Sequence, residues 1–98
     1  MTTVTLRGSE IKSEADLHET LAACLDFGPY YGNNLAALWD RLSADVPRPL
    51  TIVWENASES RRHLGVEEFD QVVLLFEDVR RQDEDAGLAN GFTYRILA

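Results

Sequence analysis

Three short runs of apolar and β-branched residues constrain this sequence most, because long stretches of helical character separate them. The runs are TVTLRG at 3–8, RPLTIVWE at 48–55 and FTYRILA at 92–98. Each predicts a strand, and strands joined through helical crossovers pair in parallel. The middle run is compact and apolar, which is typical of a strand buried on both faces. The order β-α-α-β-α-α-β predicts an α/β fold, with a small three-stranded parallel sheet packed with about four helices.

The first helix has a clear start signal. Ser13 is a favourable N-cap, and Asp16 stands three residues further on, as in a capping box. The FGP triplet at 27–29 is expected to end this helix. Its apolar stripe is expected at Leu17, Leu21, Cys24 and Leu25.

Two further helices are expected in the second half of the chain. Asn56 is a candidate cap for a short helix that stops at Gly65. Segment 66–81 gives the strongest helical periodicity, and segment 82–91 is acidic and is expected to be a solvated turn. The apolar positions in register on the longer helix are Phe69, Val72, Val73 and Phe76.

Length and charge narrow the class of protein. The 98 residues suit a single domain, 1–98, and carry a formal net charge of −8. Nucleic acid and anionic membranes repel such a surface, so neither is expected as a partner, whereas a basic protein is its electrostatic complement. The chain has one cysteine, no spanning apolar run and no visible secretory signal. A cytoplasmic location is therefore expected.

Candidate catalytic groups are few and scattered. The sequence contains no Gly-rich phosphate loop, no CxxC and no HExxH. His18 and His63 are expected to face solvent, and Cys24 is expected to be a small buried hydrophobe. The DEDAG segment lacks the alternating ligands of a calcium loop. The sequence therefore predicts no enzyme activity, no metal site and no cofactor.

The second helix, from Asn33 or Asn34 to Ser43, has an unusual polar side. Its apolar stripe is Leu35, Leu38, Trp39 and Leu42. The opposite side carries small residues around one carboxylate: Asn33, Ala36, Ala37, Asp40 and Ala44. Solvated helix faces usually carry Lys, Glu, Arg and Gln. Small residues on this side would let a partner approach the helix closely. Equally, this side could be ordinary solvated surface on a helix capped by an asparagine. These residues alone do not decide between the two.

The segment ahead of this helix leads to the same question. Tyr30 and Tyr31 belong to the residue types enriched at interface centres. Gly32 allows backbone conformations that other residues resist. One of the tyrosines could equally pack in the core, with an asparagine capping the helix.

A resemblance favours the interface. YYGNNLAALWDRL followed by PLTIVW resembles the barstar family, intracellular inhibitors of the bacterial ribonuclease barnase. The early LRGSEIKSEADLHETL and the closing helix and strand extend the resemblance over nearly the whole chain. It implies a three-stranded parallel sheet with four helices, and a one-to-one complex with a basic, guanyl-specific secreted ribonuclease.

The resemblance also implies roles for individual residues. Tyr30 matches an interface tyrosine, Trp39 a tryptophan at the interface edge, and Asp40 the central aspartate that occupies the nuclease phosphate site. Asp78 matches a peripheral acidic residue, although Glu77 could take that role in another register. The expected partner-binding residues are Tyr30, Gly32, Asn33, Asn34, Ala36, Ala37, Trp39, Asp40, Ala44 and Asp78.

Two positions depart from the family pattern. Ala36 stands where barstar carries a second interface aspartate, and Asp45 stands where it has a tryptophan. The partner implied is therefore a ribonuclease related to barnase and not barnase itself. The alternative is an interaction or antitoxin module that keeps the barstar fold without a nuclease partner.

Overall fold

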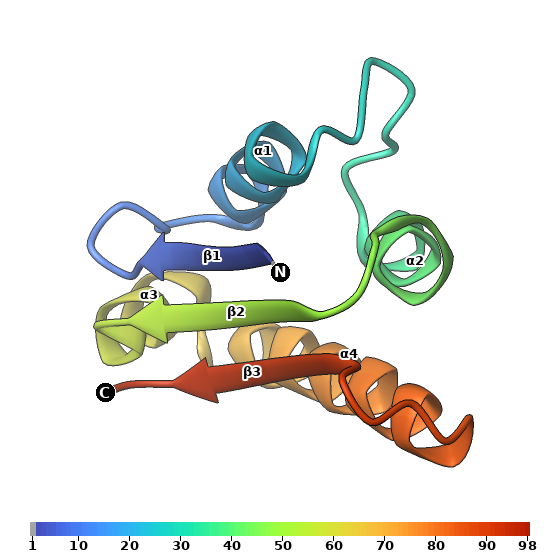
Figure 1. Ribbon diagram of the computed structural model, residues 1–98. Coiled ribbons are helices and arrows are strands. Elements are labelled where there is room, and N and C mark those ends of the chain that lie inside the picture. The colour runs from blue at the N-terminus through green and yellow to red at the C-terminus, as the bar shows by residue number, and fades with distance from the viewer. Residues whose placement is uncertain (1) are drawn as a thin grey trace.

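The computed structural model describes residues 2–98. Over these residues the chain forms three strands and four α-helices, which are labelled in Figure 1, and one π-helical segment. In chain order they are β1 (Thr2–Arg7), α1 (Glu14–Leu25), α2 (Leu35–Asp40), η1 (Arg41–Asp45), β2 (Leu50–Glu55), α3 (Ala57–Leu64), α4 (Val66–Asp85) and β3 (Phe92–Ile96). Since η1 continues α2, this order confirms the predicted fold class.

The sheet has β2 in the middle, with β1 and β3 paired to it in parallel on either side. Both crossovers therefore advance in the same direction, and right-handed connections of this kind place their helices on one face. Side chains on that face, such as Leu6, Ile52 and Phe92, are buried. The other face is exposed or half-buried and carries Thr3, Thr5, Thr51, Val53, Thr93 and Arg95. The prediction that 48–55 is buried on both faces is wrong.

The core lies between the sheet and the helices. Trp54 and Phe76 are fully buried, and the Trp54 ring lies 5.0 Å from that of Phe69. The Trp54 indole N–H donates to Ser60 Oγ at 3.0 Å, and the Ser60 hydroxyl donates to the Gly8 carbonyl at 3.0 Å. Each large apolar side chain buried here contributes about 1.5–3 kcal/mol. These contacts tie α3 and α4 to the ends of β1 and β2.

Helix α1 begins as predicted, because Ser13 Oγ accepts the Asp16 N–H at 3.1 Å and Asp16 accepts the Lys12 N–H. Two expectations for its side chains are wrong, since Cys24 is exposed and His18 is buried. The buried stripe of α1 consists of Leu17, His18 and Leu21, and Cys24 lies outside it. His63, on α3, is exposed as predicted.

Helices α3 and α4 begin and end partly as predicted. Asn56 occupies the N-cap position of α3, but with a φ of 50° and no side-chain capping bond. The free Ala57 N–H donates instead to the Leu97 carbonyl at 2.8 Å, so the end of the chain replaces the expected cap. Gly65 ends α3 as expected. Helix α4 runs on to Asp85, so the expected turn over 82–91 is helical in its first part.

The extension of α4 has a tertiary cause. Asp83 is buried, and it accepts hydrogen bonds from Arg48 Nε at 2.6 Å and from the Phe92 N–H at 2.7 Å. A buried carboxylate with such partners holds the last turn of α4 in place. The chain leaves α4 only after this last turn and then enters β3.

Candidate functional site

The loop between α1 and α2 carries two adjacent tyrosines with opposite surroundings, and it extends away from the rest of the chain in Figure 1. Tyr30 is 91% exposed, whereas Tyr31 is buried against Phe27, with ring centroids 4.7 Å apart. Tyr31 therefore fixes the loop to the core while Tyr30 faces solvent.

Tyr31 is held by a buried histidine that sequence reasoning placed in solvent. The Tyr31 hydroxyl lies 2.6 Å from His18 Nδ1, and His18 Nε2 lies 3.0 Å from Glu14 Oε1. The network fits an imidazole whose Nε2–H donates to Glu14 and whose Nδ1 accepts from Tyr31. Burial and the nearby Glu14 carboxylate raise the pKa of Tyr31 to about 12, which keeps its hydroxyl a donor. The i, i+4 spacing of Glu14 and His18 was the local signal for this pair.

Asn34 caps α2, which settles the choice between the two asparagines. Its Oδ1 accepts the Ala37 N–H at 2.8 Å, and its Nδ2 donates to the Gly32 carbonyl at 3.2 Å. The left-handed conformation of this loop belongs to Asn33, with a φ of 52°, and not to Gly32. A side chain at Gly32 would meet the Ala37 Cβ at 3.3 Å. Gly32 therefore allows close packing against the helix start, not the unusual backbone that was expected.

The polar side of α2 is open, with one exception. Asn33, Ala36, Asp40 and Ala44 are exposed, whereas Ala37 is half-buried and packs against the core. Leu38 and Leu42 are buried, and Leu35 and Trp39 are half-buried at the edge of the apolar stripe. The small-residue face is thus narrower than the helical wheel predicts.

Asp40 ends α2 with its carboxylate in solvent. Within residues 2–98 it makes no side-chain hydrogen bond and no ion pair. The neighbouring Arg41 points elsewhere, because its guanidinium lies 5.7 Å from the Phe27 ring centroid and its Nε 3.8 Å from Asp45 Oδ2. The Asp40 charge is therefore free to meet an external cation.

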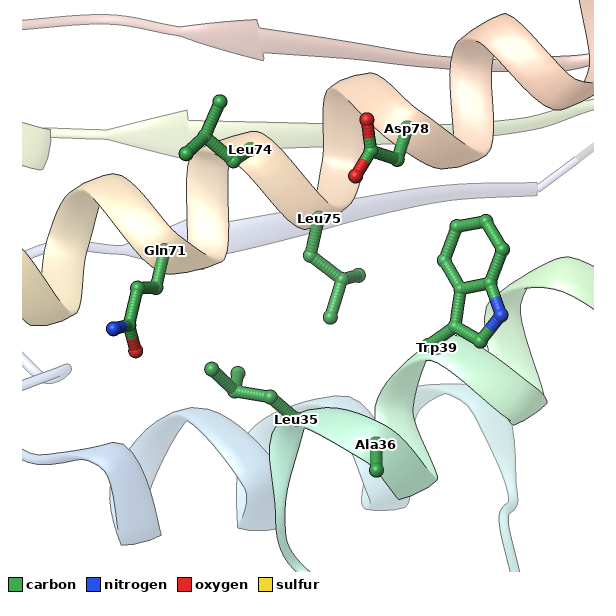
Figure 2. A pocket seen from close by; sticks show the side chains of 7 residues that line it. All are labelled: Leu35, Ala36, Trp39, Gln71, Leu74, Leu75 and Asp78. Atoms are coloured by element: carbon green, nitrogen blue, oxygen red, sulfur yellow. The ribbon is translucent and has the colours of Figure 1, made fainter.

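A groove separates α2 from α4 (Figure 2). It is a hollow of about 400 Å³ that is open to solvent, and its lining residues are Leu35, Ala36, Trp39, Gln71, Leu74, Leu75 and Asp78. We call this hollow the α2–α4 groove. Leu35 and Trp39 rise from α2 toward Leu75 on α4, while Asp78 stands near Trp39 on the α4 side. The groove lies beside the exposed side of α2.

The two candidate acids of α4 differ in their surroundings. Glu77 accepts two hydrogen bonds from Arg80 at 2.8 Å, one from Arg81 and one from the Tyr94 hydroxyl. The Arg80 bonds above all hold the pKa of Glu77 at about 2. Asp78 is exposed at the groove and makes no side-chain hydrogen bond or ion pair with any residue of 2–98. Of the two, Asp78 has the free carboxylate.

Other site types find little support in the described chain. Residues 2–98 contain no cluster of three or more His, Cys, Asp or Glu that could hold a metal ion. None of the helices described combines the length and apolar character needed to cross a bilayer. The loop, α2 and α4 each carry exposed side chains, Tyr30, Asp40 and Asp78 among them.

Comparisons with known proteins point the same way. A family model described as "Barstar (barnase inhibitor)" matches residues 1–95. The Bacillus subtilis (strain 168) protein named "Putative ribonuclease inhibitor YrdF" is 35% identical over 85 residues, which span 87% of this chain and 92% of that protein. Both descriptions are of inhibitors, so the resemblance is confirmed, as is the prediction that the chain is not an enzyme.

Proposed function

The chain belongs to the barstar family, and on that premise we propose that it is a cytoplasmic inhibitor that plugs the active site of a secreted bacterial ribonuclease. The complex is one-to-one, and the target is a basic, guanyl-specific enzyme. The observation that carries this proposal is the Asp40 carboxylate, which is exposed and unpaired within residues 2–98 and stands among small side chains.

Asp40 is the substitute for the substrate phosphate. Enzymes that cleave phosphodiesters gather cationic groups around the scissile phosphate. A carboxylate presented to those groups satisfies their charge and offers no bond to cleave. Ala36 and Ala44 let the enzyme surface approach the α2 backbone closely enough for Asp40 to enter the active site.

Tyr30 and Asp78 extend the contact on the two sides of Asp40. Tyr30 supplies a large exposed aromatic surface on an anchored loop, the kind of residue found at interface centres. Asp78 supplies a second acidic contact from α4, and the Trp39 side chain rises from α2 toward it (Figure 2). The remaining residues assigned to the interface are Gly32, Asn33, Asn34 and Ala37, of which Ala37 contributes least because it packs against the core.

The overall charge assists the encounter. A net charge of −8 attracts a basic enzyme over distances comparable to the Debye length, about 10 Å at 0.1 M salt. Electrostatic complementarity of this kind raises association rates. Inhibition inside the producing cell protects its own RNA before the enzyme is exported.

The direct experiment titrates the purified chain against a panel of guanyl-specific bacterial ribonucleases, barnase included, while RNA cleavage is followed. Stoichiometric inhibition of at least one enzyme supports the proposal, and its loss in Asp40→Ala supports the plug mechanism. Glu10→Ala is the matched control, because Glu10 is exposed in the turn after β1, at the opposite end of the sheet from α2 (Figure 1). If no member of the panel is inhibited, the proposal is wrong.

A second candidate function keeps the fold and changes the partner. Ala36 presents only a methyl group at the position of the second interface aspartate of barstar, which removes an anionic contact. This favours an interaction or antitoxin module that binds a protein other than a nuclease. Affinity capture that recovers a basic nuclease would rule this candidate out.

A further inference from the structure

The turn between α4 and β3 carries an Asn–Gly pair, and asparagine is a thermolabile residue. The backbone nitrogen that follows an asparagine can attack the side-chain amide carbon and close a five-membered succinimide ring. Glycine favours this attack, because it has no Cβ to obstruct the approach and allows many backbone conformations. The chain has four asparagines, and the one that precedes a glycine is Asn90.

The fold leaves both reacting groups of this pair open. Asn90 is exposed, and Gly91 lines a hollow of about 190 Å³ that is open to solvent. Two nearby N–H groups, of Leu88 and Phe92, donate to Asp83. The Gly91 N–H, by contrast, takes part in none of the hydrogen bonds found within residues 2–98. The attacking nitrogen therefore has no competing acceptor, and water can reach the ring once it has closed.

The other three asparagines are held in ways that oppose the reaction. The Ala57 N–H, which would have to attack the Asn56 side chain, donates to the Leu97 carbonyl at 2.8 Å. The side-chain amide of Asn34 is fixed by the hydrogen bonds that cap α2. Asn33 precedes a residue with a Cβ, which hinders the approach of its nitrogen. The structure therefore singles out Asn90.

Asp83 explains why glycine follows Asn90. A Cβ on Gly91 would lie 2.7 Å from the Asp83 Cβ and 2.8 Å from Asp83 Oδ2, which is closer than non-bonded atoms approach. The same carboxylate pairs with Arg48 and accepts the Phe92 N–H. A larger residue would push Asp83 away from both partners. The fold thus requires the very residue that makes Asn90 reactive.

We propose that Asn90 is a site of spontaneous deamidation, and that its isoaspartyl product weakens the attachment of β3 to Asp83. The Gly91 nitrogen bonds to the Asn90 side-chain carbon, the bond from that carbon to its NH2 group breaks, and ammonia leaves with the proton of the Gly91 N–H. Water then opens the succinimide at either carbonyl: its OH adds to the carbon and its hydrogen returns to the nitrogen. The products are aspartate and isoaspartate.

The two products change the turn differently. Both add one negative charge, but isoaspartate also inserts a methylene into the main chain two residues before Phe92. The Phe92 N–H must lie 2.7 Å from Asp83 Oδ2, and Gly91 packs directly against Asp83. A longer main chain displaces this N–H, so a hydrogen bond to a charged acceptor is lost. The equilibrium constant for unfolding of the isoaspartyl form should therefore rise about tenfold or more.

The test incubates the folded protein in mildly alkaline buffer and maps it with trypsin. Trypsin cleaves after Arg81 and Arg95, so fragment 82–95 contains Asn90 and none of the other asparagines. Mass spectrometry follows the mass gained when an amide becomes a carboxylic acid. Synthetic fragments that contain aspartate or isoaspartate at position 90 identify the two products by chromatography. A synthetic peptide of the native 82–95 sequence gives the reaction rate without the fold.

We expect Asn90 in the folded protein to convert within about threefold of its rate in the free peptide, because the fold does not protect it. Fragments with Asn33, Asn34 and Asn56 should keep their mass over the same time. Asn90→Gln should keep the mass of fragment 82–95 and the stability of wild type, since the longer side chain closes its ring slowly. Gly91→Ala should also slow the reaction, but at the cost of stability, because its Cβ meets Asp83.

Urea unfolding tests the effect on the fold. The incubated wild type should contain a less stable population that matches its isoaspartyl fraction. Freshly purified Asn90→Asp, which carries the new charge on an ordinary main chain, should unfold like wild type.

The other outcomes overturn the inference. Conversion more than about tenfold slower in the protein than in the peptide would mean that the turn protects Asn90. Conversion of Asn56 as fast as that of Asn90 would show that the hydrogen bonds do not set the selectivity. If the isoaspartyl form is as stable as wild type, or Asn90→Asp is as unstable as that form, the added methylene does not weaken the fold. Inhibition by fresh protein bears on none of these results, so the proposed function is tested separately.

Discussion

Arg48 and Asp83, 35 positions apart in sequence, form a two-pronged ion pair, with Nε to Oδ2 at 2.6 Å and Nη2 to Oδ1 at 3.3 Å. Arg48 also donates to the carbonyls of Leu42, at 2.7 Å, and Val46, at 2.9 Å. One guanidinium therefore joins the end of the π-helical segment to the last turn of α4. The pair fixes the two helices that carry the candidate site relative to each other.

Loss of this pair should be costly for folding. Asp83→Asn leaves the largely buried Arg48 guanidinium without a counter-charge, which is expected to lower the free energy of unfolding by about 3–5 kcal/mol. Asp85→Asn, at an exposed position on the same helix, should change it by about 0.5 kcal/mol or less. Urea denaturation of the two variants and wild type measures both values. Equal stability of the two variants would contradict the role of the pair.

The same pair predicts a pH dependence. Burial by itself raises the pKa of Asp83, but hydrogen bonds from Arg48 and the Phe92 N–H outweigh it and hold the pKa below the ordinary value of 3.8. The stabilisation is therefore complete above the unfolded-state pKa and is lost as pH falls through the folded-state value. The stability difference between wild type and Asp83→Asn should be constant near neutral pH and shrink below about pH 4. Denaturation curves at several pH values test this, and a constant difference down to pH 2 would exclude it.

The adjacent tyrosines offer a matched pair of substitutions. Tyr31→Phe removes the partner of the buried His18 Nδ1, so it should lower the free energy of unfolding by about 1–3 kcal/mol. Tyr30→Phe removes a hydroxyl from a side chain that is 91% exposed and should leave stability unchanged. Thermal and urea unfolding of the two variants give the comparison. A larger loss in Tyr30→Phe would mean that the roles of the two rings are reversed.

Asp40→Ala separates binding from folding. The central carboxylate would be desolvated among several cations, so its removal should weaken ribonuclease binding by about 2–5 kcal/mol, mainly through faster dissociation. That range is the usual cost of truncating one partner of a buried, hydrogen-bonded charge pair; close charge pairs in the barnase–barstar complex, a reference case for this effect, have coupling energies of about 1.5–7 kcal/mol. Unfolding of the free protein should hardly change, because Asp40 is exposed. Inhibition equal to wild type would disprove the plug mechanism, and unfolding of the variant would make Asp40 structural.

The two acids of α4 should behave in opposite ways. Asp78→Ala should weaken binding by roughly 1 kcal/mol or less, mostly through slower association, and leave the fold unaffected. Glu77→Ala should leave binding nearly unchanged and destabilise α4 and β3, since Glu77 joins Arg80, Arg81 and Tyr94. Stopped-flow association rates and unfolding curves distinguish the variants. A loss in Asp78→Ala as large as that of Asp40→Ala would show that the interface centre lies on α4.

The sequence predicts the order of elements well because their signals are local. Ser13 and Asp16 mark the start of α1, and short runs of apolar and β-branched residues mark the strands. The buried polar residues are less accessible, because their partners are remote: Tyr31 lies 13 residues from His18, and Arg48 lies 35 from Asp83. From the sequence alone a histidine or aspartate is expected at the surface, because the remote partner that allows its burial is not visible.

How much of the candidate site the sequence predicts is limited by similar causes. Its exposed members, such as Tyr30 and Asp40, follow from the helical pattern and from the family resemblance. The burial of Ala37 and the groove beside Leu74 depend on how α2 packs against α4, which no local pattern encodes. The open face of the sheet depends on the common direction of the two crossovers, which becomes visible once the strand order is known.

The anchoring of Tyr31 has a kinetic consequence for its neighbour. Ordering a flexible backbone lowers its conformational entropy at a cost of about 1–2 kcal/mol for each residue. Here that ordering takes place when the chain folds, because His18 and Phe27 hold Tyr31 in place before any partner arrives. The loop is therefore preorganised, and docking against Tyr30 needs little rearrangement after the first collision.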